Sequence, residues 1–232
     1  MLIDRTNGRV LDVLESREKA VIVAWLKAGV SSGLLAHLEE VTTDMWDGYV
    51  EAVKEVLGVR VRITIDRFHV MANFQEWLAD ARREIQRRLP KEAVAELKGT
   101  RWKWLTNEEN LTAEDRQVLG SLKRKYPMLA QLAEQRESLR AIFEDRGITT
   151  GDAGIQRLRA WCEGAKNLGL AALSSFTRTL ERWMDKIANY FVSRSTNAQT
   201  EGYNHGLRAI LWRTFGMRNF GHFRARVLQT FG

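Results

Sequence analysis

The sequence contains a single cysteine and only two prolines in 232 residues. Cys162 has no partner for an intramolecular disulfide, and no Cys/His cluster has the spacing of zinc ligands, so neither a disulfide framework nor a structural zinc site is expected. A hydrophobic fraction of 44% excludes a disordered chain and favours a folded, mostly helical protein. No apolar run reaches the length of a membrane span, and the N-terminus lacks the pattern of a signal peptide. We therefore expect a cytoplasmic protein.

Acidic residues are scarce near the C-terminus. From Phe191 to Gly232 one acid, Glu201, stands against six arginines, which leaves a net charge of +5 in this tail, and the whole chain carries +7. Because neutralised phosphates release counterions, a basic stretch of this kind favours a polyanionic partner. A solvated helix face is the alternative explanation. The six arginines are Arg194, Arg208, Arg213, Arg218, Arg224 and Arg226.

The first third of the chain alternates between strand and helix patterns. Residues 2–14 form two short β-prone runs joined by Asn7-Gly8, a strong hairpin signal. Helices are predicted at about 18–29, 34–39 and 47–57, and strands at 41–43 and 59–65. This alternation predicts an α/β sheet layer.

Beyond His69 no strand signal follows for more than a hundred residues. Apolar residues at helical spacing predict helices at about 74–89, 91–97, 113–125, 128–145, 153–166 and 170–193, and a last helix that begins near Asn197. The sequence therefore predicts a partial α/β core over 1–89, a helical insertion over 90–193, and a core helix with an arginine-rich tail over 194–232.

Two acidic residues each follow a predicted strand. Asp44 and Asp66 would face the crevice in which open α/β sheets bind their ligands, and the two would be neighbours if their strands pair. Asp44 could instead cap the next helix, but Asp47 is better placed for that role. His69 could lie beside the same site or be an ordinary hydrogen-bonded residue at a helix start.

Glu201 falls at the beginning of the last predicted helix. Asn197, Asn204 and Arg208 share its helix face, at spacings of three and four residues. The alternative is a carboxylate that merely complements the helix dipole. Gly202, a residue that costs roughly 1 kcal/mol in a helix, favours close approach of a backbone or a metal ion at this point.

Scattered carboxylates of this kind fit metal-assisted phosphoryl transfer. Mg²⁺ prefers carboxylate oxygens and retains several waters, so it needs few protein ligands. Two ions roughly 3.5–4 Å apart can activate an attacking oxygen and stabilise a leaving one. Asp44 and Glu201 are therefore the candidate catalytic metal ligands, with Mg²⁺ as the expected ion and Mn²⁺ as a substitute.

Several ordered motifs resemble the DDE transposases of bacterial insertion sequences, specifically the ISL-three group. The resemblance covers essentially the whole chain. The motifs are Thr43–Trp46 followed by Gly48-Tyr49, Asp66–Val70, Arg101–Leu105 with Asn110–Thr112, Thr196–Asn204, and Phe215–Phe220 followed by Phe223-Arg224. The resemblance implies a ribonuclease-H-like α/β fold whose helical insertion precedes the Glu-bearing helix.

The resemblance also implies roles for individual residues. Asp44 would be the second acid of the catalytic triad and Glu201 the third, with the helix partners of Glu201 and the Asp66–His69 motif beside them. The tail arginines would contact double-stranded transposon DNA, in a homo-oligomer associated with the nucleoid. The family's first Asp lies on a strand just before the opening hairpin, where this chain has no residue, and Asp4 belongs to the hairpin itself.

We therefore expect a transposase that hydrolyses DNA phosphodiesters and transfers strands. The family's N-terminal zinc-binding and helix-turn-helix regions have no counterpart here, and His205 replaces an Asn that the family usually has. With two of three acids, this polypeptide alone is expected to be inactive or nearly so. Two alternatives stay open: a non-catalytic DNA-binding remnant that regulates or interferes with a full-length transposase, and a nuclease or resolvase of the same fold.

Overall fold

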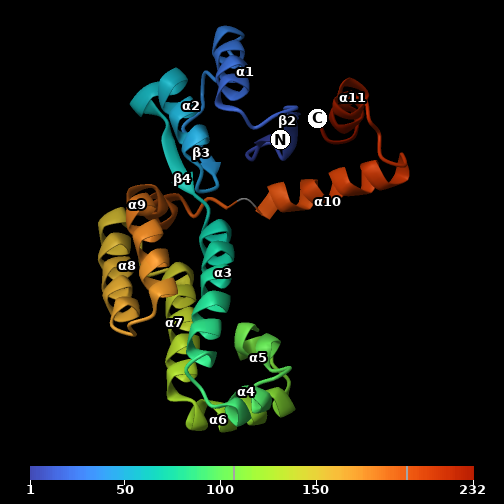
Figure 1. Cartoon of the computed structure of the whole chain (residues 1–232). Coiled ribbons are helices and arrows are strands. Elements are labelled where there is room, and N and C mark those ends of the chain that lie inside the picture. Colours follow the sequence, from blue (N-terminus) through green and yellow to red (C-terminus); the bar gives the residue numbers. More distant parts are fainter. Residues whose placement is uncertain (107, 197) are drawn as a thin grey trace. The chain divides into compact units, whose positions relative to one another are not determined.

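The computed structural model describes residues 1–106, 108–196 and 198–232 (Figure 1). The chain divides into two compact units, each described by itself below. Unit 1 comprises Met1–Asp66 with Ser195–Gly232, and unit 2 comprises Arg67–Arg194. The helix that begins at Arg67 packs with the other helices of unit 2. The domain bounds expected from the sequence, 1–89, 90–193 and 194–232, stay predictions.

The chain opens with the expected hairpin. Strands β1 (Leu2–Asp4) and β2 (Arg9–Asp12) pair antiparallel, with Ile3 opposite Val10. In the turn, the backbone N–H and the side-chain amide of Asn7 donate to the Asp4 carboxylate at 3.1 and 2.6 Å. Gly8 has φ 62°, a left-handed conformation that favours glycine.

A second sheet consists of strands β3 (Glu40–Thr43) and β4 (Arg62–Ile65), which run parallel. Helix α2 (Asp47–Leu57) and the short 3₁₀ helix η1 (Gly58–Arg60) connect the two strands, and α1 (Lys19–Ser31) packs against α2. The expected α/β alternation is confirmed. The protein has two separate two-stranded sheets in its described part rather than one continuous sheet.

Two element predictions in this region are wrong. The segment 34–39 forms turns and irregular backbone rather than a helix, because the Leu35 N–H donates to the Gly29 carbonyl at 3.2 Å and the Leu35 side chain packs against Gly29 at the end of α1. The strand expected from residue 59 begins at Arg62. Val59 lies in η1 and is fully exposed, so its β-branched side chain has no sheet neighbour to pack against.

The hairpin packs on two helices from the other end of the chain. Helix α10 (Ala198–Arg213) begins where a helix was predicted. Helix α11 (Phe220–Phe231) was not anticipated as a separate element, although Asn219 is an N-cap that accepts the His222 N–H at 2.9 Å. The buried centre of this cluster is Val10, Val13 and Val227, and the residues packed around it include Ile3, Tyr203, Leu207, Ile210, Phe223 and Phe231.

Unit 2 is helical throughout its described residues. The long helices α3, α7, α8 and α9 form a bundle around an aromatic centre in which Phe74 contacts Trp161 and Phe176 (Figure 1). The elements are α3 (Arg67–Gln86), α4 (Lys91–Glu96), α5 (Arg101–Leu105), η2 (Glu108–Asn110), α6 (Ala113–Lys125), α7 (Pro127–Glu144), α8 (Gly151–Lys166) and α9 (Ala171–Ser193). The helical block is therefore confirmed, with α5 as an addition.

Cys162 lies in the interior of this bundle. Burial raises the pKa of its thiol to about 12, with a smaller contribution from the Glu181 charge. The thiol is therefore neutral and shielded from solvent, in accordance with a packing role. In the described part of the chain, no helix is both long and apolar enough to cross a membrane.

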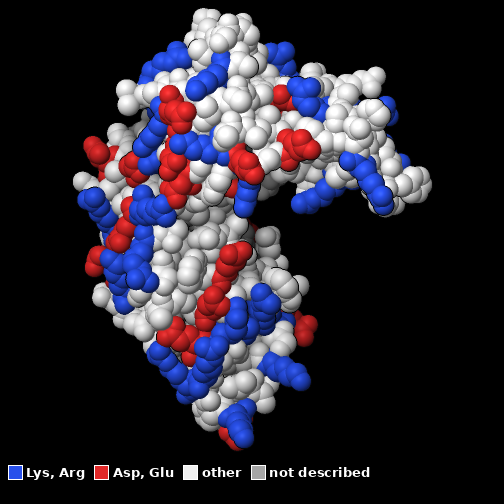
Figure 2. Space-filling view, turned by 45° about the horizontal axis from the view of Figure 1, so that its top comes forward, with Lys and Arg blue, Asp and Glu red and all other residues white. Residues whose placement is uncertain are grey.

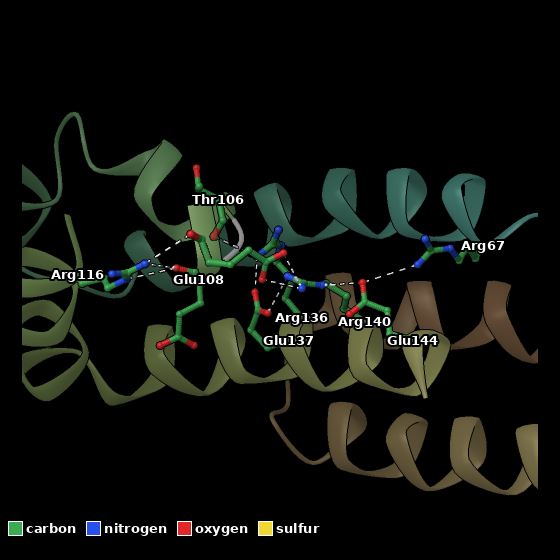
Figure 3. Close-up of polar contacts among 9 residues, drawn as sticks. Arg67, Thr106, Glu108, Arg116, Arg136, Glu137, Arg140 and Glu144 are labelled. Atoms are coloured by element: carbon green, nitrogen blue, oxygen red, sulfur yellow. Dashed lines mark hydrogen bonds and ion pairs between the residues drawn. The ribbon is translucent and has the colours of Figure 1, made fainter. Parts of the chain in front are cut away.

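An arginine and glutamate network ties the loop before α6 to α7 (Figure 3). The Arg136 side chain is only 4% exposed; it donates to the Thr106 carbonyl at 3.2 Å and pairs with Glu137 at 2.5 Å. Arg140 pairs with Glu109 at 2.6 Å and with Glu144 at 3.0 Å. A charge as deeply buried as that of Arg136 needs such partners, because an unpaired one would be strongly destabilising.

Arg194 closes the bundle rather than pointing freely to solvent. Its guanidinium donates to the carbonyls of Phe143 at 3.0 Å and Asp145 at 2.7 Å, and to that of Ile148. The guanidinium carbon also lies 5.3 Å from the ring centre of Tyr190. These contacts satisfy carbonyl groups at the end of α7, which have no partner within the helix. The structure thus gives Arg194 a structural task that the sequence analysis did not foresee.

The substitution Arg194→Ala should lower the free energy of unfolding of unit 2 by about 2–4 kcal/mol, because charged donors to several carbonyls are lost together. Denaturant unfolding followed by circular dichroism measures this loss. Arg146→Ala, an exposed arginine in the adjoining loop, is the matched control and should change stability by less than about 0.5 kcal/mol. Equal effects of the two substitutions would contradict the structural role of Arg194.

Candidate functional site

Asp44 and Asp66 lie side by side at the carboxyl ends of the parallel strands. Thr43 and Ile65 are register partners, and the Asp66 N–H donates to the Thr43 carbonyl at 3.2 Å. Asp66 is fully buried, whereas Asp44 is half-buried. The sequence prediction that these two residues are neighbours is confirmed. Parallel strands require it, because their last residues reach the same edge of the sheet.

Neither Asp44 nor Asp47 caps helix α2. The N-cap is Trp46, and no side chain there accepts a backbone N–H. Asp47, which the sequence analysis favoured as the cap, lies in the first turn of the helix instead. The Asp44 carboxylate accepts a long hydrogen bond of 3.4 Å from the Thr43 hydroxyl. The capping explanation for Asp44 therefore does not hold, and the position keeps its functional interest.

Aromatic packing fixes the loop that carries Asp44. The Trp46 ring lies so close to the backbone of Gly48 that a Cβ there would meet ring carbons at 2.2–2.5 Å. The same ring contacts Tyr49 edge-on at 4.6 Å between centroids, and the Arg17 guanidinium lies 5.6 Å from its centre. The motif residues Trp46, Gly48 and Tyr49 thus act as one packing unit, which the sequence pattern marked without revealing the reason.

The negative charge of Asp44 affects the pKa of the neighbouring Tyr49. Burial raises the pKa of the Tyr49 hydroxyl, and the negative charge of Asp44 raises it further, while Arg17 acts in the opposite direction. Tyr49 therefore stays neutral and can donate a hydrogen bond. Asp44 is half-buried near Tyr49, and a partly desolvated carboxylate interacts more strongly with a bound cation than a fully solvated one does.

A residue that the sequence analysis missed connects the strand pair to the C-terminal segment. The Glu40 carboxylate accepts hydrogen bonds from the hydroxyls of Thr64 on β4 and, at 2.5 Å, of Ser195. Both hydroxyl residues are fully buried. Ser195 precedes the helix that carries Glu201, so this contact brings the start of that segment to the strands that end at Asp44 and Asp66. Glu40 lies at the opposite end of β3, where no motif pointed to it.

The remaining predicted site residues lie on or near α10. Glu201 is in the first turn of α10, as expected, but its side chain and the whole of Asn197 lie outside the described residues. Asn204 is exposed on the same helix. Gly202 has open space where a Cβ would stand, so the expected close approach of backbone is not found. By contrast, a Cβ at Gly206 would meet the Phe231 ring at 2.5 Å.

His69 lies in the first turn of α3 and is half-buried. It belongs to unit 2, whereas Asp44 and Asp66 belong to unit 1. Its position beside Asp44 therefore stays a prediction, as does the meeting of Asp44 with Glu201. Within residues 1–106, 108–196 and 198–232, no group of three His, Cys, Asp or Glu side chains gathers closely enough to hold a metal ion.

The tail arginines differ in their surroundings. Arg208, Arg213, Arg218 and Arg226 are exposed, and make no ion pair with the described side chains of the chain. Figure 2 shows lysine and arginine side chains dispersed over one face of the molecule. Arg224 is different, because its guanidinium forms a two-pronged contact with Asp12 at 2.5 and 3.0 Å. Four of the six predicted arginines are thus available to a ligand without breaking a contact.

Asp12 is the buried anchor for Arg224. Its carboxylate also accepts from the Val13 N–H at 2.7 Å and from the Trp25 indole N–H at 2.8 Å. Burial by itself raises the pKa of Asp12, but the hydrogen bonds from Arg224, Val13 and Trp25 outweigh it and leave the pKa below its ordinary value. The contact joins β2 to α11 and α1, so Arg224 holds unit 1 together.

Residues 82–103 hold a further group of eight lysine and arginine residues, three of which are paired with nearby acids. Arg83 pairs with Asp80 at 2.5 Å, Arg88 pairs with Glu84 at 2.6 Å, and Lys103 pairs with Asp115. Such pairing is typical of a solvated helix surface. For Arg83, Arg88 and Lys103 the structure therefore favours a solvated surface role.

A comparison with protein families agrees with the motif analysis. A family model described as a transposase matches residues 1–227. This chain belongs to the DDE transposases of the ISL-three group. The chain is 24% identical over 235 residues to the transposase for insertion sequence element IS1001 of Bordetella parapertussis, a match that covers 100% of this chain and 56% of that protein. It therefore spans about half the length of this relative. No solved structure matches the chain.

The substitution Asp12→Asn should destabilise unit 1 by about 1.5–3 kcal/mol near neutral pH, because a charge-assisted pair with Arg224 is lost. Since the folded pKa of Asp12 lies below its unfolded value, this stabilisation is complete above about pH 4 and is lost as the pH falls through the folded pKa. Unfolding free energies of the wild type and of Asp12→Asn should therefore converge on acidification below about pH 4.

Glu51→Gln provides the control, since Glu51 pairs with Lys19 at an exposed position of the same unit. Its effect should stay within about 0.5 kcal/mol at every pH. A difference between the wild type and Asp12→Asn that persists unchanged at strongly acidic pH would show that the lost stability does not come from the ionised carboxylate.

Proposed function

We propose that this chain is the catalytic region of a transposase that hydrolyses DNA phosphodiesters and transfers strands with the help of divalent cations. Asp44 and Glu201 are the proposed metal ligands, and Asp66, His69, Asn197 and Asn204 the residues around them. The observation that carries the proposal is the place of Asp44: it ends a parallel strand beside a buried Asp66, in a chain whose family membership covers nearly its whole length.

The chemistry of Asp44 fits a hard divalent cation. Its carboxylate is half-buried, has no capping role, and accepts only a long hydrogen bond from Thr43 among the contacts described. Mg²⁺ is bound through one or two carboxylates and keeps several waters, so such a partly exposed oxygen suits it, and Mn²⁺ could replace it. When bound, the ions would supply charge stabilisation for the attacking and leaving oxygens of the phosphodiester.

The Glu40–Ser195 contact supports the convergence of Asp44 and Glu201. Six residues separate Ser195 from Glu201, and a chain of this length, half extended and half helical, reaches at most about 16 Å. Four strand residues separate Glu40 from Asp44, a distance of about 13 Å along β3. These lengths are comparable, so a chain fixed at Ser195 can bring the Glu201 carboxylate to the Asp44 edge of the strands. Glu40 is accordingly proposed as a residue that positions the Glu-bearing helix.

The fold is proposed to be ribonuclease-H-like with an incomplete sheet. Unit 1 holds an antiparallel pair and a parallel pair of strands that are not hydrogen-bonded to each other. One further strand is needed to join them into a continuous sheet, and the resemblance to the family places its first aspartate on such a strand. We propose that the 232-residue polypeptide, with two of the three acids, is inactive or nearly so by itself.

Double-stranded DNA, both transposon end and target, is the proposed partner, bound in the cytoplasm at the nucleoid by a homo-oligomer. The four exposed tail arginines support this proposal, because no acidic side chain among the described residues pairs with them. Arg194 and Arg224 were predicted for the same role. Their guanidinium groups are held by carbonyl oxygens and by Asp12, so we assign DNA contact chiefly to the other four.

Metal binding tests the site. Titration of the protein with Mn²⁺, followed by electron paramagnetic resonance, should show weak binding that is reduced at least several-fold in Asp44→Asn and in Glu201→Gln. Asp47→Asn is the matched control, because Asp47 lies three residues away in the first turn of α2. If Asp47→Asn weakened Mn²⁺ binding as much as Asp44→Asn, the assignment of Asp44 as a ligand would fail.

Incubation with transposon-end DNA and Mn²⁺ or Mg²⁺ tests activity. The polypeptide should bind the DNA and leave it uncut, or nearly so. Robust cleavage would refute the proposed inactivity, and cutting of branched DNA without strand transfer would identify a nuclease or resolvase instead. DNA binding that is unchanged in Asp44→Asn and without any Mn²⁺ binding would favour a purely regulatory DNA-binding role.

DNA binding should also be steeply salt-dependent. Replacing Arg208 and Arg226 together by alanine should weaken binding and reduce the slope of log affinity against log salt by roughly 1 for each arginine that contacts a phosphate. Arg159→Ala, an exposed arginine on α8, should leave the slope unchanged. Fluorescence anisotropy with a labelled duplex over a range of salt concentrations measures both quantities, and equal slopes in all variants would exclude this surface.

A further inference from the structure

The last turn of α10 and the connection that follows it present two large aromatic side chains to solvent. Trp212 is 82% exposed and Phe215 is 99% exposed. Other aromatic residues of the same helices, Tyr203, Phe223 and Phe231, pack on the hairpin. The two exposed rings are thus left out of an apolar core that lies on the same pair of helices. Exposed aromatic groups of this size mark interaction surfaces more often than random surface positions do.

The backbone holds Phe215 in an unusual conformation. Its φ is 51°, in the left-handed region that bulky residues rarely adopt, and the next residue, Gly216, also has a positive φ of 78°. The turn is secured by the Gly216 N–H, which donates to the Leu211 carbonyl at 2.8 Å, and by the Thr214 hydroxyl, which donates to the Ile210 carbonyl at 2.8 Å. Left-handed bulky residues concentrate at ligand-binding sites, where the surrounding structure maintains them.

The charge around the two rings favours a nucleic acid. Arg213 and Arg218 flank them and are exposed, and the sequence after Glu201 contains no acidic residue up to its end. A second copy of this chain would bring like charge to the same surface, which opposes association. DNA offers phosphates to the arginines and flat bases to the rings, and aromatic side chains that stack on or insert between bases are common in proteins that deform DNA.

We propose that Trp212 and Phe215 form an aromatic wedge that stacks on unpaired or destacked bases of DNA, while Arg213 and Arg218 hold the adjacent phosphates. The proposal rests on the proposed function for its partner, DNA, and adds the form of DNA that is recognised. A wedge of this kind selects distorted or gapped DNA over fully paired duplex. It needs neither a bound metal ion nor cleavage, so it can be tested on the chain as it is.

The test compares two DNA probes, a fully paired duplex and the same duplex with a short single-stranded gap. The wild type should bind the gapped probe about 5- to 100-fold more tightly, the range that stacking of a base on an aromatic side chain provides. Trp212→Ala and Phe215→Ala should lose this preference and still bind the paired duplex as well as the wild type. Trp212→Phe should retain most of the preference, because a ring remains.

Two sets of control variants distinguish base stacking by Trp212 and Phe215 from the effect of positive charge and from the effect of any exposed aromatic ring. Arg213→Ala and Arg218→Ala should weaken binding of both probes alike and reduce the salt dependence. Trp102→Ala removes a ring that is 68% exposed in unit 2 and should leave the preference intact. Because Trp212 and Phe215 contribute little to the core, thermal unfolding of their variants should match the wild type.

The possible failures are distinguishable. Salt-dependent binding of both probes without any preference would overturn the wedge and leave the proposed function standing. Absence of DNA binding would overturn the wedge together with the DNA partner, whatever the result of the Mn²⁺ titration. A change of oligomeric state in Trp212→Ala and Phe215→Ala, measured by light scattering, with the gap preference intact would show that the rings bind a second copy instead.

Discussion

The hydrogen bonds of the Glu40 carboxylate join segments of unit 1 that lie 155 residues apart in the sequence. Glu40 accepts from Thr64 on the neighbouring strand and from Ser195 at the beginning of the C-terminal segment. A carboxylate that receives two buried hydroxyl donors is well satisfied, and loss of one partner would leave a polar group unpaired in the interior. This contact fixes the start of the C-terminal segment, six residues before Glu201, beside the strand pair.

The arginines of this chain serve physically different ends. Arg136, Arg194 and Arg224 have structural roles, because their guanidinium groups donate to carbonyl or carboxylate oxygens within the fold. The exposed arginines of α10, α11 and the turn between them have no such structural contact. The net charge therefore overestimates how many arginines are free to bind DNA. Only the contacts of each guanidinium show whether that arginine is structural or available. Arg83 and Arg88 near the end of α3 illustrate the same point, because each is paired with an acid one turn earlier.

Much of the fold follows from local sequence signals. The Asn7-Gly8 turn, the strand before Asp44 and the long helices of unit 2 lie where periodicity and turn residues predict them. The misses have local causes. Val59 is β-branched but has no strand beside it, and residues 34–39 carry a helical composition although Leu35 folds back on Gly29. Helix α11 is separated from α10 by a short turn in which Gly216 has a positive φ and Asn219 caps the next helix, a break that apolar periodicity alone does not reveal.

The sequence by itself determined the family, the candidate acids Asp44 and Glu201, and the adjacency of Asp44 to Asp66, because motif order and strand ends are properties of the linear chain. Only the tertiary structure decided which arginines are engaged, that Ser195 meets Glu40, and that Trp212 and Phe215 remain outside the core. The physical reason is that burial and pairing depend on which distant segments come together. Hydrogen bonds to Asp12 or Glu40 leave no periodic trace in the sequence that could reveal them.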